Sequence, residues 1–350
     1  MLTYFFYNIL LLSVVAFGYT AEYANDKRVR SFSRICVFLS LFVPAAIRLE
    51  VGYDYDGYSN IYEGVDPGAI VEPGYLFIQE TARFFQLDTQ WIFVLSSFVM
   101  YFPICFFIGR KSYFLIVIFY TLYIYLESLS FVRQYMAVSF LICGLYYYLY
   151  SLGKKKWFYF SFASLLFHLS SALYLLTIPF RRFVVKHSFV VWGIVLISYV
   201  FIIRLSFTDF IFDIAALIMP RYAVYADSDI WNAATELGSG LGVVIRLLTP
   251  LCVLFYRKKL LFQIKKNCYL VSLSLLYIFV NFLTLKIQIF GRLNDLFSFV
   301  ILFGVSELLQ MSSINRKVIV TLLLFFSLLL FEKTIMHVYP YQSIFSKDLL

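Results

Sequence analysis

Long apolar runs follow one another along this chain, with short polar segments between them. An α-helix of about 20 mostly apolar residues is long enough to cross the hydrocarbon core of a bilayer. The pattern therefore predicts an all-α, polytopic membrane protein with about ten transmembrane helices. We place them at residues 2–19, 32–47, 91–108, 113–126, 129–150, 190–207, 241–256, 268–285, 293–309 and 318–335.

Residues 157–180 are also apolar and long enough for one span, but their flanks conflict with a simple crossing. Basic residues at 154–156 precede the run and others at 181–186 follow it, and both groups favour the cytoplasmic side. A re-entrant helical hairpin that turns at 168–171 satisfies both ends. Because non-helical backbone at membrane depth needs protein or a wet cavity around it, this turn should line a cavity. A single span with one misplaced basic group is the alternative.

The composition of the chain supports the membrane class. Hydrophobic residues make up 62% of the 350 residues and charged residues only 14%, against roughly 25% charged in soluble domains. We expect one integral-membrane domain over residues 1–350. The net charge of +9 would suit nucleic acid, but the basic residues cluster at span ends, so no nucleic-acid partner is expected. The five cysteines lie in or beside apolar runs at spacings unlike a metal site, and no metal or other cofactor is expected.

The distribution of charge orients the predicted spans. Most of the 29 Lys and Arg residues then lie on the cytoplasmic side. Both termini and the loops 48–90 and 208–238 are expected outside. All but three of the 20 acidic residues, Glu22, Asp26 and Glu307, are also expected outside. Acidic residues contribute little to membrane orientation, so this asymmetry exceeds what orientation requires.

The loop 48–90 gathers tyrosines, carboxylates and turn-forming Gly and Pro directly after an apolar run. Aromatic faces stack on the C–H groups of sugar rings, and carboxylates accept hydrogen bonds from hydroxyls. The loop therefore favours a sugar-binding site. The alternative is an ordinary external loop that is polar because water surrounds it.

Four arginines lie at the expected outer ends of spans, apart from the cytoplasmic basic clusters: Arg48, Arg133, Arg246 and Arg292. A charge in a transmembrane helix costs roughly 3 kcal/mol at the bilayer centre and less near the interface. A guanidinium bonds two phosphate oxygens at once, so four arginines on one face predict a site for an anionic headgroup. Alternatively, each one snorkels to lipid headgroups or pairs with a nearby carboxylate. Gln134 adds a polar side chain at the depth of Arg133.

Several short motifs follow one another along most of the chain, and each occurs once. They are Arg48 with Val51-Gly52-Tyr53-Asp54-Tyr55 and Tyr58, Glu72-Pro73-Gly74-Tyr75, Phe131-Val132-Arg133-Gln134-Tyr135-Met136-Ala137, Leu166-Phe167-His168-Leu169-Ser170-Ser171-Ala172-Leu173, Arg221-Tyr222 with Tyr225, Phe290-Gly291-Arg292 and Tyr339-Pro340-Tyr341. Each motif alone is weak. Together their order and spacing resemble the EpsG-like branch of the Wzy polysaccharide polymerases.

The resemblance implies a GT-C-like polymerase in the cytoplasmic (inner) membrane, with its active site facing the periplasm or exterior. Such an enzyme joins undecaprenyl-pyrophosphate-linked oligosaccharide repeats into O-antigen, capsule or exopolysaccharide. Membrane lipid is a second expected partner, and such polymerases commonly work beside a chain-length regulator protein. The four outer arginines would then hold the pyrophosphate. The candidate sugar-binding residues are Tyr53, Tyr55, Tyr58, Glu72, Gln134, Arg221 and Tyr222.

His168 is the expected general base of such a reaction. Of the three histidines it alone lies inside an apolar stretch, at the predicted turn. Removing the proton of a sugar hydroxyl as the new bond forms is worth roughly 10²–10⁴-fold in rate, and imidazole exchanges its proton near neutral pH. Asp54 and Asp56 are the competing bases, but a carboxylate must lose its water to become strong enough. A hydrogen-bonded core histidine is the non-catalytic alternative.

Other functions fit parts of the same pattern. A flippase of lipid-linked oligosaccharide would bind the same ligand, but it needs a cavity open to both faces, and the predicted inner face offers only solvated basic ends. A polyprenyl-phosphate-sugar-dependent glycosyltransferase often carries an acidic motif in its first external loop. Asp54 and Asp56 come after the second predicted span instead. A membrane acyltransferase would need a histidine deep in a site that faces the cytosol. The predicted topology of His168 disfavours this function.

Overall fold

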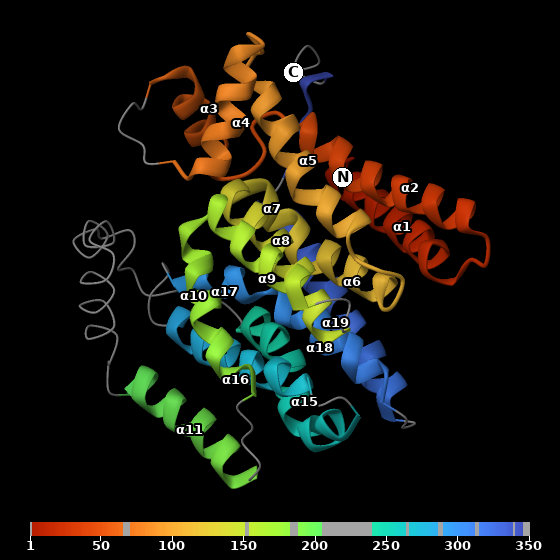
Figure 1. Ribbon diagram of the computed structural model, residues 1–350, viewed down its shortest axis with the longest axis vertical. Helices are drawn as coiled ribbons and strands as arrows, with labels where there is room; N and C mark the ends of the chain where they lie inside the picture. Colours follow the sequence, from red (N-terminus) through yellow and green to blue (C-terminus); the bar gives the residue numbers. More distant parts are fainter. Residues whose placement is uncertain are drawn as a thin grey trace. The chain divides into compact units, whose positions relative to one another are not determined.

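The computed structural model of the protein describes residues 2–65, 71–150, 154–182, 188–204, 240–263, 266–285, 290–311, 315–338 and 340–345. Helices make up nearly all of this part of the chain (Figure 1). The chain divides into two compact units, residues 1–176 with 324–350 and residues 177–323. The single membrane domain expected from the sequence stays a prediction.

The helices of the first unit follow the apolar runs, except that two helices also form in the polar segment after the second run. The run at 113–130 stays helical throughout but contains one π-helical turn, η1. The elements are α1 (Leu2–Tyr23), α2 (Lys27–Ala46), α3 (Tyr55–Glu63), α4 (Pro73–Phe84), α5 (Gln90–Phe106), α6 (Tyr113–Tyr120), η1 (Thr121–Tyr125), α7 (Leu126–Ser130), α8 (Val132–Leu149), α9 (Lys154–Ala163), the 3-10 turns η2 (Ser164–Leu166) and η3 (Leu169–Ser171), α10 (Ala172–Thr177) and the later part of α19 (Asn315–Val338).

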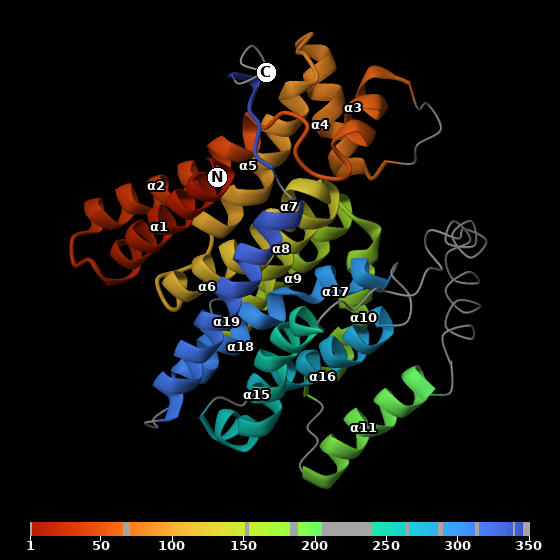
Figure 2. The ribbon, with the colours of Figure 1, turned by 180° about the vertical axis from the view of Figure 1, so that it is seen from behind.

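The core of the first unit lies in the helical run Tyr113–Ser130 and in α8, where nearly every side chain is buried. The helices α1 and α2 lie side by side, and α2, α5, α8 and α9 follow as successive neighbours (Figures 1 and 2). Two buried hydroxyls join the core, since Tyr101 and Ser128 lie 2.9 Å apart. Further polar side chains are buried in the same core, among them Thr121, Ser139 and Gln134. Such side chains can hydrogen-bond between or within the helices of a bundle surrounded by lipid.

Two of the three acids expected on the cytoplasmic side accept backbone hydrogen bonds at helix starts. The Asp26 carboxylate accepts from the backbone N–H of Arg28 at 2.6 Å and caps α2. The Glu22 carboxylate accepts from the backbone N–H of Phe114 at 2.7 Å, at the start of α6. The first N–H groups of a helix have no intrahelical partner, so a carboxylate there is stabilising. These two acids therefore have structural roles.

A segment near the end of the chain returns to the base of the 48–90 loop. Ser343 forms an antiparallel bridge with Arg48, flanked by two 3.0 Å backbone hydrogen bonds, from Leu49 to Gln342 and from Ile344 to Ile47. Both views show this segment beside the end of α2 (Figures 1 and 2). The bridge ties the first residues of the loop in place.

The apolar segment 157–180 is not one continuous helix. It breaks at His168, whose backbone is extended (φ −158°, ψ 122°) between the turns η2 and η3. The indole N–H of Trp157 donates to the Tyr174 hydroxyl at 3.4 Å. A straight helix would separate these residues by about 25 Å, so the chain folds back on itself. The break lies where the sequence predicts a turn, while its re-entrant position in a bilayer stays a prediction.

The second unit contains the helices α11 (Ser188–Arg204), α15 (Leu241–Gln263), α16 (Asn267–Thr284), α17 (Gly291–Phe297) and α18 (Phe299–Leu309), together with the 3-10 turn η4 (Ile178–Arg182). The helix α16 lies against α15, α11 and α17. Glu307, the third acid expected inside, is buried and accepts hydrogen bonds from Asn267 at 3.0 Å and Gln310 at 3.2 Å. It too has structural partners.

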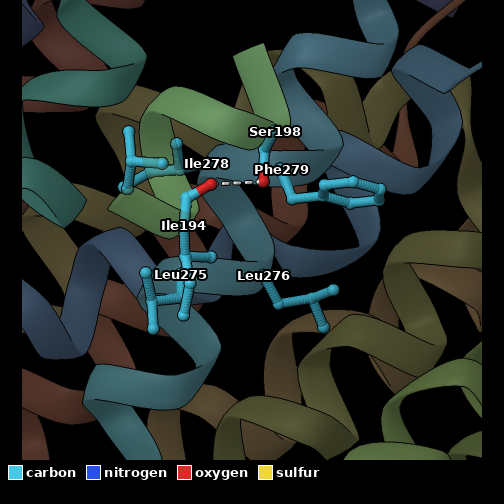
Figure 3. Close-up of a pocket in the computed structure, with 7 residues that line it drawn as sticks. Ile194, Ser198, Leu275, Leu276, Ile278 and Phe279 are labelled. Atoms are coloured by element: carbon cyan, nitrogen blue, oxygen red, sulfur yellow. Dashed lines mark hydrogen bonds between the residues drawn. The ribbon is translucent and has the colours of Figure 1, made fainter. Parts of the chain in front are cut away.

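A small apolar hollow of about 200 Å³ lies between α11 and α16 (Figure 3). Its one polar lining side chain is Ser198, which donates to the backbone carbonyl of Ile194 at 2.7 Å. The other lining side chains, such as Leu275 and Phe279, are apolar. The hollow therefore offers a ligand no free polar group.

The described residues include five helices that are long and apolar enough to cross a membrane, and two shorter apolar helices. All seven overlap predicted spans. The expectation of a multi-pass membrane protein is confirmed, whereas the number of ten spans stays a prediction. The five are Leu2–Tyr23, Lys27–Ala46, Tyr113–Ser130, Asn267–Thr284 and Lys317–Ile335, and the shorter two are Gln90–Phe106 and Phe189–Ile202.

Candidate functional site

The polar segment after α2 carries the first part of the candidate site and folds into α3 and α4. Pro73 occupies the first position of α4, which suits proline because the first N–H of a helix has no intrahelical partner. In α3, the Tyr55 ring stacks on Phe93 of α5 with centroids 4.3 Å apart and planes 6° apart. This stacking holds α3 against the end of the bundle.

Two glycines of this segment lie against the backbone of later segments. Gly52 has φ +104°, and a Cβ there would overlap the carbonyl oxygen of Leu129. A Cβ on Gly74 would lie 2.7 Å from the carbonyl oxygen of Leu166, two residues before His168. Side chains cannot be added at such distances without moving the backbone. The glycines therefore let the loop approach α7 and η2 closely.

Glu72 contacts two other charged or titratable side chains. One oxygen of its carboxylate, Oε2, accepts from Nη1 of Arg133 at 2.8 Å. The other, Oε1, lies 3.1 Å from Nδ1 of His168. Glu72 comes from the residue before α4, Arg133 from the first turn of α8, and His168 from the break between η2 and η3. The fold thus gathers three of the predicted site residues from three segments.

Burial differs among the three side chains of this cluster. The Glu72 side chain is only 9% exposed, whereas those of Arg133 and His168 are 23% and 21% exposed. The carboxylate is thus enclosed by its two partners, and each partner keeps an accessible part. A ligand can therefore reach the guanidinium and the imidazole more easily than the carboxylate.

Two tyrosines flank the guanidinium of Arg133. Its Cζ lies 5.9 Å from the ring centroid of Tyr58 and 6.0 Å from that of Tyr75, within the range of cation–π attraction. The two rings lie 5.6 Å apart, and the backbone N–H of Arg133 donates to the Tyr58 hydroxyl at 3.4 Å. Both tyrosines are buried. The guanidinium is therefore held by aromatic rings as well as by a carboxylate.

The environment of Glu72 favours the charged carboxylate. Burial alone raises its pKa, but the hydrogen bond with His168 and the positive charge of Arg133 outweigh burial and lower the pKa of Glu72 to about 2. A carboxylate that accepts bonds from a cation is stabilised in its ionised form. Glu72 therefore stays ionised throughout the physiological pH range.

The backbone around His168 is held by serines on both sides. Its N–H donates to the carbonyl of Ser164 at 3.2 Å, and its carbonyl accepts from the backbone N–H and the hydroxyl of Ser171, at 3.1 Å and 2.7 Å. The backbone N–H and carbonyl of His168 are thereby both satisfied, which a break at membrane depth would require. Nε2 of His168 makes no hydrogen bond to the described residues.

Arg48, a predicted pyrophosphate ligand, is buried in the first unit, and only 1% of its surface is exposed. Its guanidinium lies 4.7 Å from the ring centroid of Phe93, and Nη1 donates to the carbonyl of Ala45. Among the described residues, no hydrogen bond reaches its Nε or Nη2. Arg48 therefore lies in the packed interior of the first unit, and its contact with substrate stays a prediction.

The other candidates of the first unit are placed differently from one another. Tyr53 is 69% exposed, and its backbone N–H donates to the hydroxyl of Ser130 at 3.0 Å. Asp56 is exposed in the first turn of α3, and Asp54 directly precedes that helix and is half-buried. Gln134 is buried, 2% exposed, beside Arg133 in α8. Their predicted roles stay predictions.

The remaining candidates belong to the second unit or lie outside the described residues. Arg246 lies in α15 and Arg292 in the first turn of α17. Arg221 and Tyr222 fall within the residues that the structure does not describe. The expected grouping of these residues with Arg133 therefore stays a prediction.

Sequence reasoning placed Glu72 among the sugar-binding residues and did not expect its contacts with Arg133 and His168. Glu72 lies 61 residues from Arg133 and 96 from His168, so no local spacing could have indicated these contacts. Tyr75 was not proposed for the site at all. The signal for it in the sequence is that Tyr75 ends the motif that begins with Glu72.

Comparison with known proteins agrees with the resemblance read from the sequence. No curated protein and no solved structure that was compared with the chain matches it significantly. A family model described as the EpsG family matches residues 31–345, which include every residue of the Glu72 cluster. That match covers nearly the whole chain. The chain therefore belongs to the EpsG family, a family of membrane proteins of the polysaccharide-polymerase type.

Proposed function

We propose that this protein is a polysaccharide polymerase that joins undecaprenyl-pyrophosphate-linked oligosaccharide repeats at the outer face of the cytoplasmic membrane. The observation that carries the proposal is the Glu72 carboxylate, which contacts a cation, Arg133, and a candidate base, His168. A glycosyl transfer to a hydroxyl is accelerated by both groups, the cation by stabilising the leaving phosphate and the base by taking the proton of the acceptor. Family membership supports the same class of reaction.

In the proposed reaction, a hydroxyl of the incoming repeat attacks the anomeric carbon of the growing chain. His168 takes the proton of that hydroxyl as the new C–O bond forms. The bond between the anomeric carbon and the pyrophosphate oxygen breaks, and its electron pair leaves with undecaprenyl pyrophosphate. The proton on His168 later passes to solvent or to the released phosphate. No redox partner is involved.

The Arg133 guanidinium would stabilise the negative charge that develops on the leaving pyrophosphate. A fixed cation that is already oriented stabilises such a charge without reorganising at the moment of reaction. Its two tyrosine neighbours and Glu72 hold it in this orientation. Arg246 and Arg292 are proposed as further pyrophosphate ligands. Arg48 would act there only if its buried surroundings moved.

The sugars are proposed to bind along the loop 48–90. Tyr53 offers an exposed aromatic ring on which a sugar can stack. Tyr55, Tyr58 and Gln134 are largely buried in the structure, so they would shape the floor of the site. Arg221 and Tyr222 are proposed to complete it from the second external loop.

The proposed setting is a GT-C-like arrangement of about ten spans with one re-entrant hairpin. Both termini and the loops 48–90 and 208–238 would lie outside, with the cluster at Glu72 on the same side. The growing polymer would then form where lipid-linked repeats arrive after they cross the membrane. A chain-length regulator is the proposed protein partner.

The test is a strain that lacks the protein and is complemented with the wild-type gene or with His168→Gln. We expect the wild type to restore long polymer, and the empty strain and the variant to accumulate single repeats on lipid at the outer face. Lipid-linked repeats that remain at the cytoplasmic face in the deletion strain would contradict the proposal and indicate a flippase. Normal polymer in the deletion strain would also contradict it.

A further inference from the structure

Glu72 uses each of its carboxylate oxygens for a different partner, Oε2 for Arg133 and Oε1 for His168. We propose that Glu72 is a positioning residue that fixes His168 in the tautomer with the proton on Nδ1, so that Nε2 is the nitrogen that accepts a proton. The catalytic meaning of this assignment rests on the function proposed above, but the tautomer itself does not.

The tautomer follows from the chemistry of the pair. An ionised carboxylate has no proton and can only accept a hydrogen bond. The short contact between Oε1 of Glu72 and Nδ1 of His168 therefore requires Nδ1 to be the donor. A neutral imidazole carries one proton, so Nε2 is left with its lone pair. That nitrogen makes no hydrogen bond to the described residues.

The carboxylate is itself held in one orientation. Rotation of the Glu72 side chain would break its 2.8 Å contact with Arg133 as well as its contact with His168. Pro73 and the close approach of Gly74 to Leu166 fix the backbone next to it. The imidazole is therefore oriented by a group that cannot turn freely, which is what a precise proton acceptor needs.

The same arrangement links the base to the cation. When Nε2 accepts a proton, the new imidazolium charge lies beside the Glu72 carboxylate, which stabilises it, and near Arg133, which opposes it. An anion that binds Arg133 would reduce this opposition. Glu72 thus places the proton acceptor and the anion ligand in one electrostatic unit.

The experiment is nitrogen NMR of the full-length protein in lipid nanodiscs, labelled with ¹⁵N-histidine. The chain has only three histidines, so His187→Gln and His337→Gln assign the His168 resonances. At a pH at which the His168 imidazole is neutral, we expect a protonated, pyrrole-type Nδ1 and an unprotonated, pyridine-type Nε2. The opposite pattern, or equal populations of both tautomers in the wild type, would overturn the proposal without any variant.

Glu72→Gln tests the cause. The amide can accept from Nδ1–H or donate to a bare Nδ1, so we expect the two nitrogen shifts to move toward each other as both tautomers become populated. Glu80→Gln is the matched control, because Glu80 lies in α4, the helix that Glu72 precedes, and also pairs with an arginine, Arg83, at 2.6 Å. It should leave the His168 resonances unchanged. Equal spectra for both variants would overturn the role of Glu72.

Polymer synthesis by the same variants separates this inference from the proposed function. We expect Glu72→Gln to lower polymer about 100-fold at equal membrane abundance, within the range of a lost general base. It should also change the pH profile, which a merely structural loss would not. If the tautomer is as expected but His168→Gln polymerises normally, the proposed function fails and the tautomer assignment stands.

Discussion

Glu72 and His168 are 96 positions apart in the sequence, yet Oε1 of one lies 3.1 Å from Nδ1 of the other. The contact joins the loop after α2 to the break that follows α9. Because the same carboxylate also holds Arg133 of α8, three segments meet at one buried side chain. A change at Glu72 should therefore affect stability, proton transfer and anion binding together.

The first prediction concerns stability in acid. The folded state lowers the pKa of Glu72 from 4.5 to about 2, so its carboxylate stabilises the fold above about pH 4.5, and this contribution is lost as pH falls toward 2. Glu72→Gln should lower the free energy of unfolding by at most about 3 kcal/mol near neutral pH. The difference from wild type should shrink between pH 4.5 and 2.

Thermal unfolding in detergent across this pH range measures the effect. Glu80→Gln, which removes a carboxylate from an exposed pair, should change stability little at any pH. A difference between Glu72→Gln and wild type that stays constant with pH would contradict the assigned cause.

The second prediction ranks the candidate bases. His168→Gln should abolish polymer because it removes the proposed proton acceptor, whereas Asp54→Asn should weaken polymerisation and Asp56→Asn should weaken it less. Polymer amount and length are measured at equal membrane abundance across pH. His187→Gln is the control, and it should polymerise normally. Normal polymer from His168→Gln with none from Asp54→Asn would reverse the roles.

The third prediction concerns the guanidinium at the site. Arg133→Lys keeps the charge but loses the planar fork that contacts Glu72 and, in the proposed function, would contact a phosphate as well. It should therefore lose most polymerisation. Arg292→Lys is expected to lose most activity for the same reason. The control is Arg83→Lys, which changes an exposed arginine of α4 and should retain activity. Near-normal polymer from the first two variants would show that charge alone suffices.

The fourth prediction uses the close approach of α4 to the segment before His168. A Cβ at Gly74 would lie 2.7 Å from the carbonyl oxygen of Leu166, so Gly74→Ala should push Glu72 away from His168. We expect at least a 10-fold loss of polymer and about 1–3 kcal/mol of destabilisation. A Cβ added at Gly57 of α3 would have no described atom within 4 Å. Gly57→Ala should therefore be neutral or stabilise the protein by up to about 1 kcal/mol. Equal behaviour of the two variants would remove the steric argument.

The fifth prediction concerns the segment 157–180. Reporters fused after Lys156 and after Arg182 should both read cytoplasmic, and one within 60–70 should read external. The physical reason is that both basic groups favour the cytoplasmic side while the chain doubles back at His168. Opposite readings at 156 and 182 would indicate a plain span.

Hydrophobic pattern and charge predicted the class of the fold well. The five long apolar helices and the two shorter ones coincide with predicted spans. The reason is that a helix in lipid needs a long run of apolar residues, which can be read directly from the sequence. The break at His168 was also expected, since basic groups on both sides of one apolar run are hard to reconcile with a single crossing. The helices α3 and α4 were not, because the same residues suit a polar loop.

The contacts of the site were less accessible to sequence reasoning. His168 and Arg133 were selected because a titratable or charged side chain in an apolar segment is costly and therefore informative. Glu72 carried no such signal, since it lies in a segment where acids are common. Its importance comes from burial and from two partners far along the chain, and only the folded structure brings these together. Arg48 was selected by the same argument as Arg133, but the structure buries it beside Phe93.

The bridge between Ser343 and Arg48 sets an order in which the protein can be completed. Synthesis proceeds from the N-terminus at about 5–20 residues per second, so roughly 15–60 s separate the emergence of Arg48 from that of Ser343. Glu72, Arg133 and His168 are all made within that interval. The base of the loop 48–90 therefore lacks these backbone hydrogen bonds until residues 340–345 have been made.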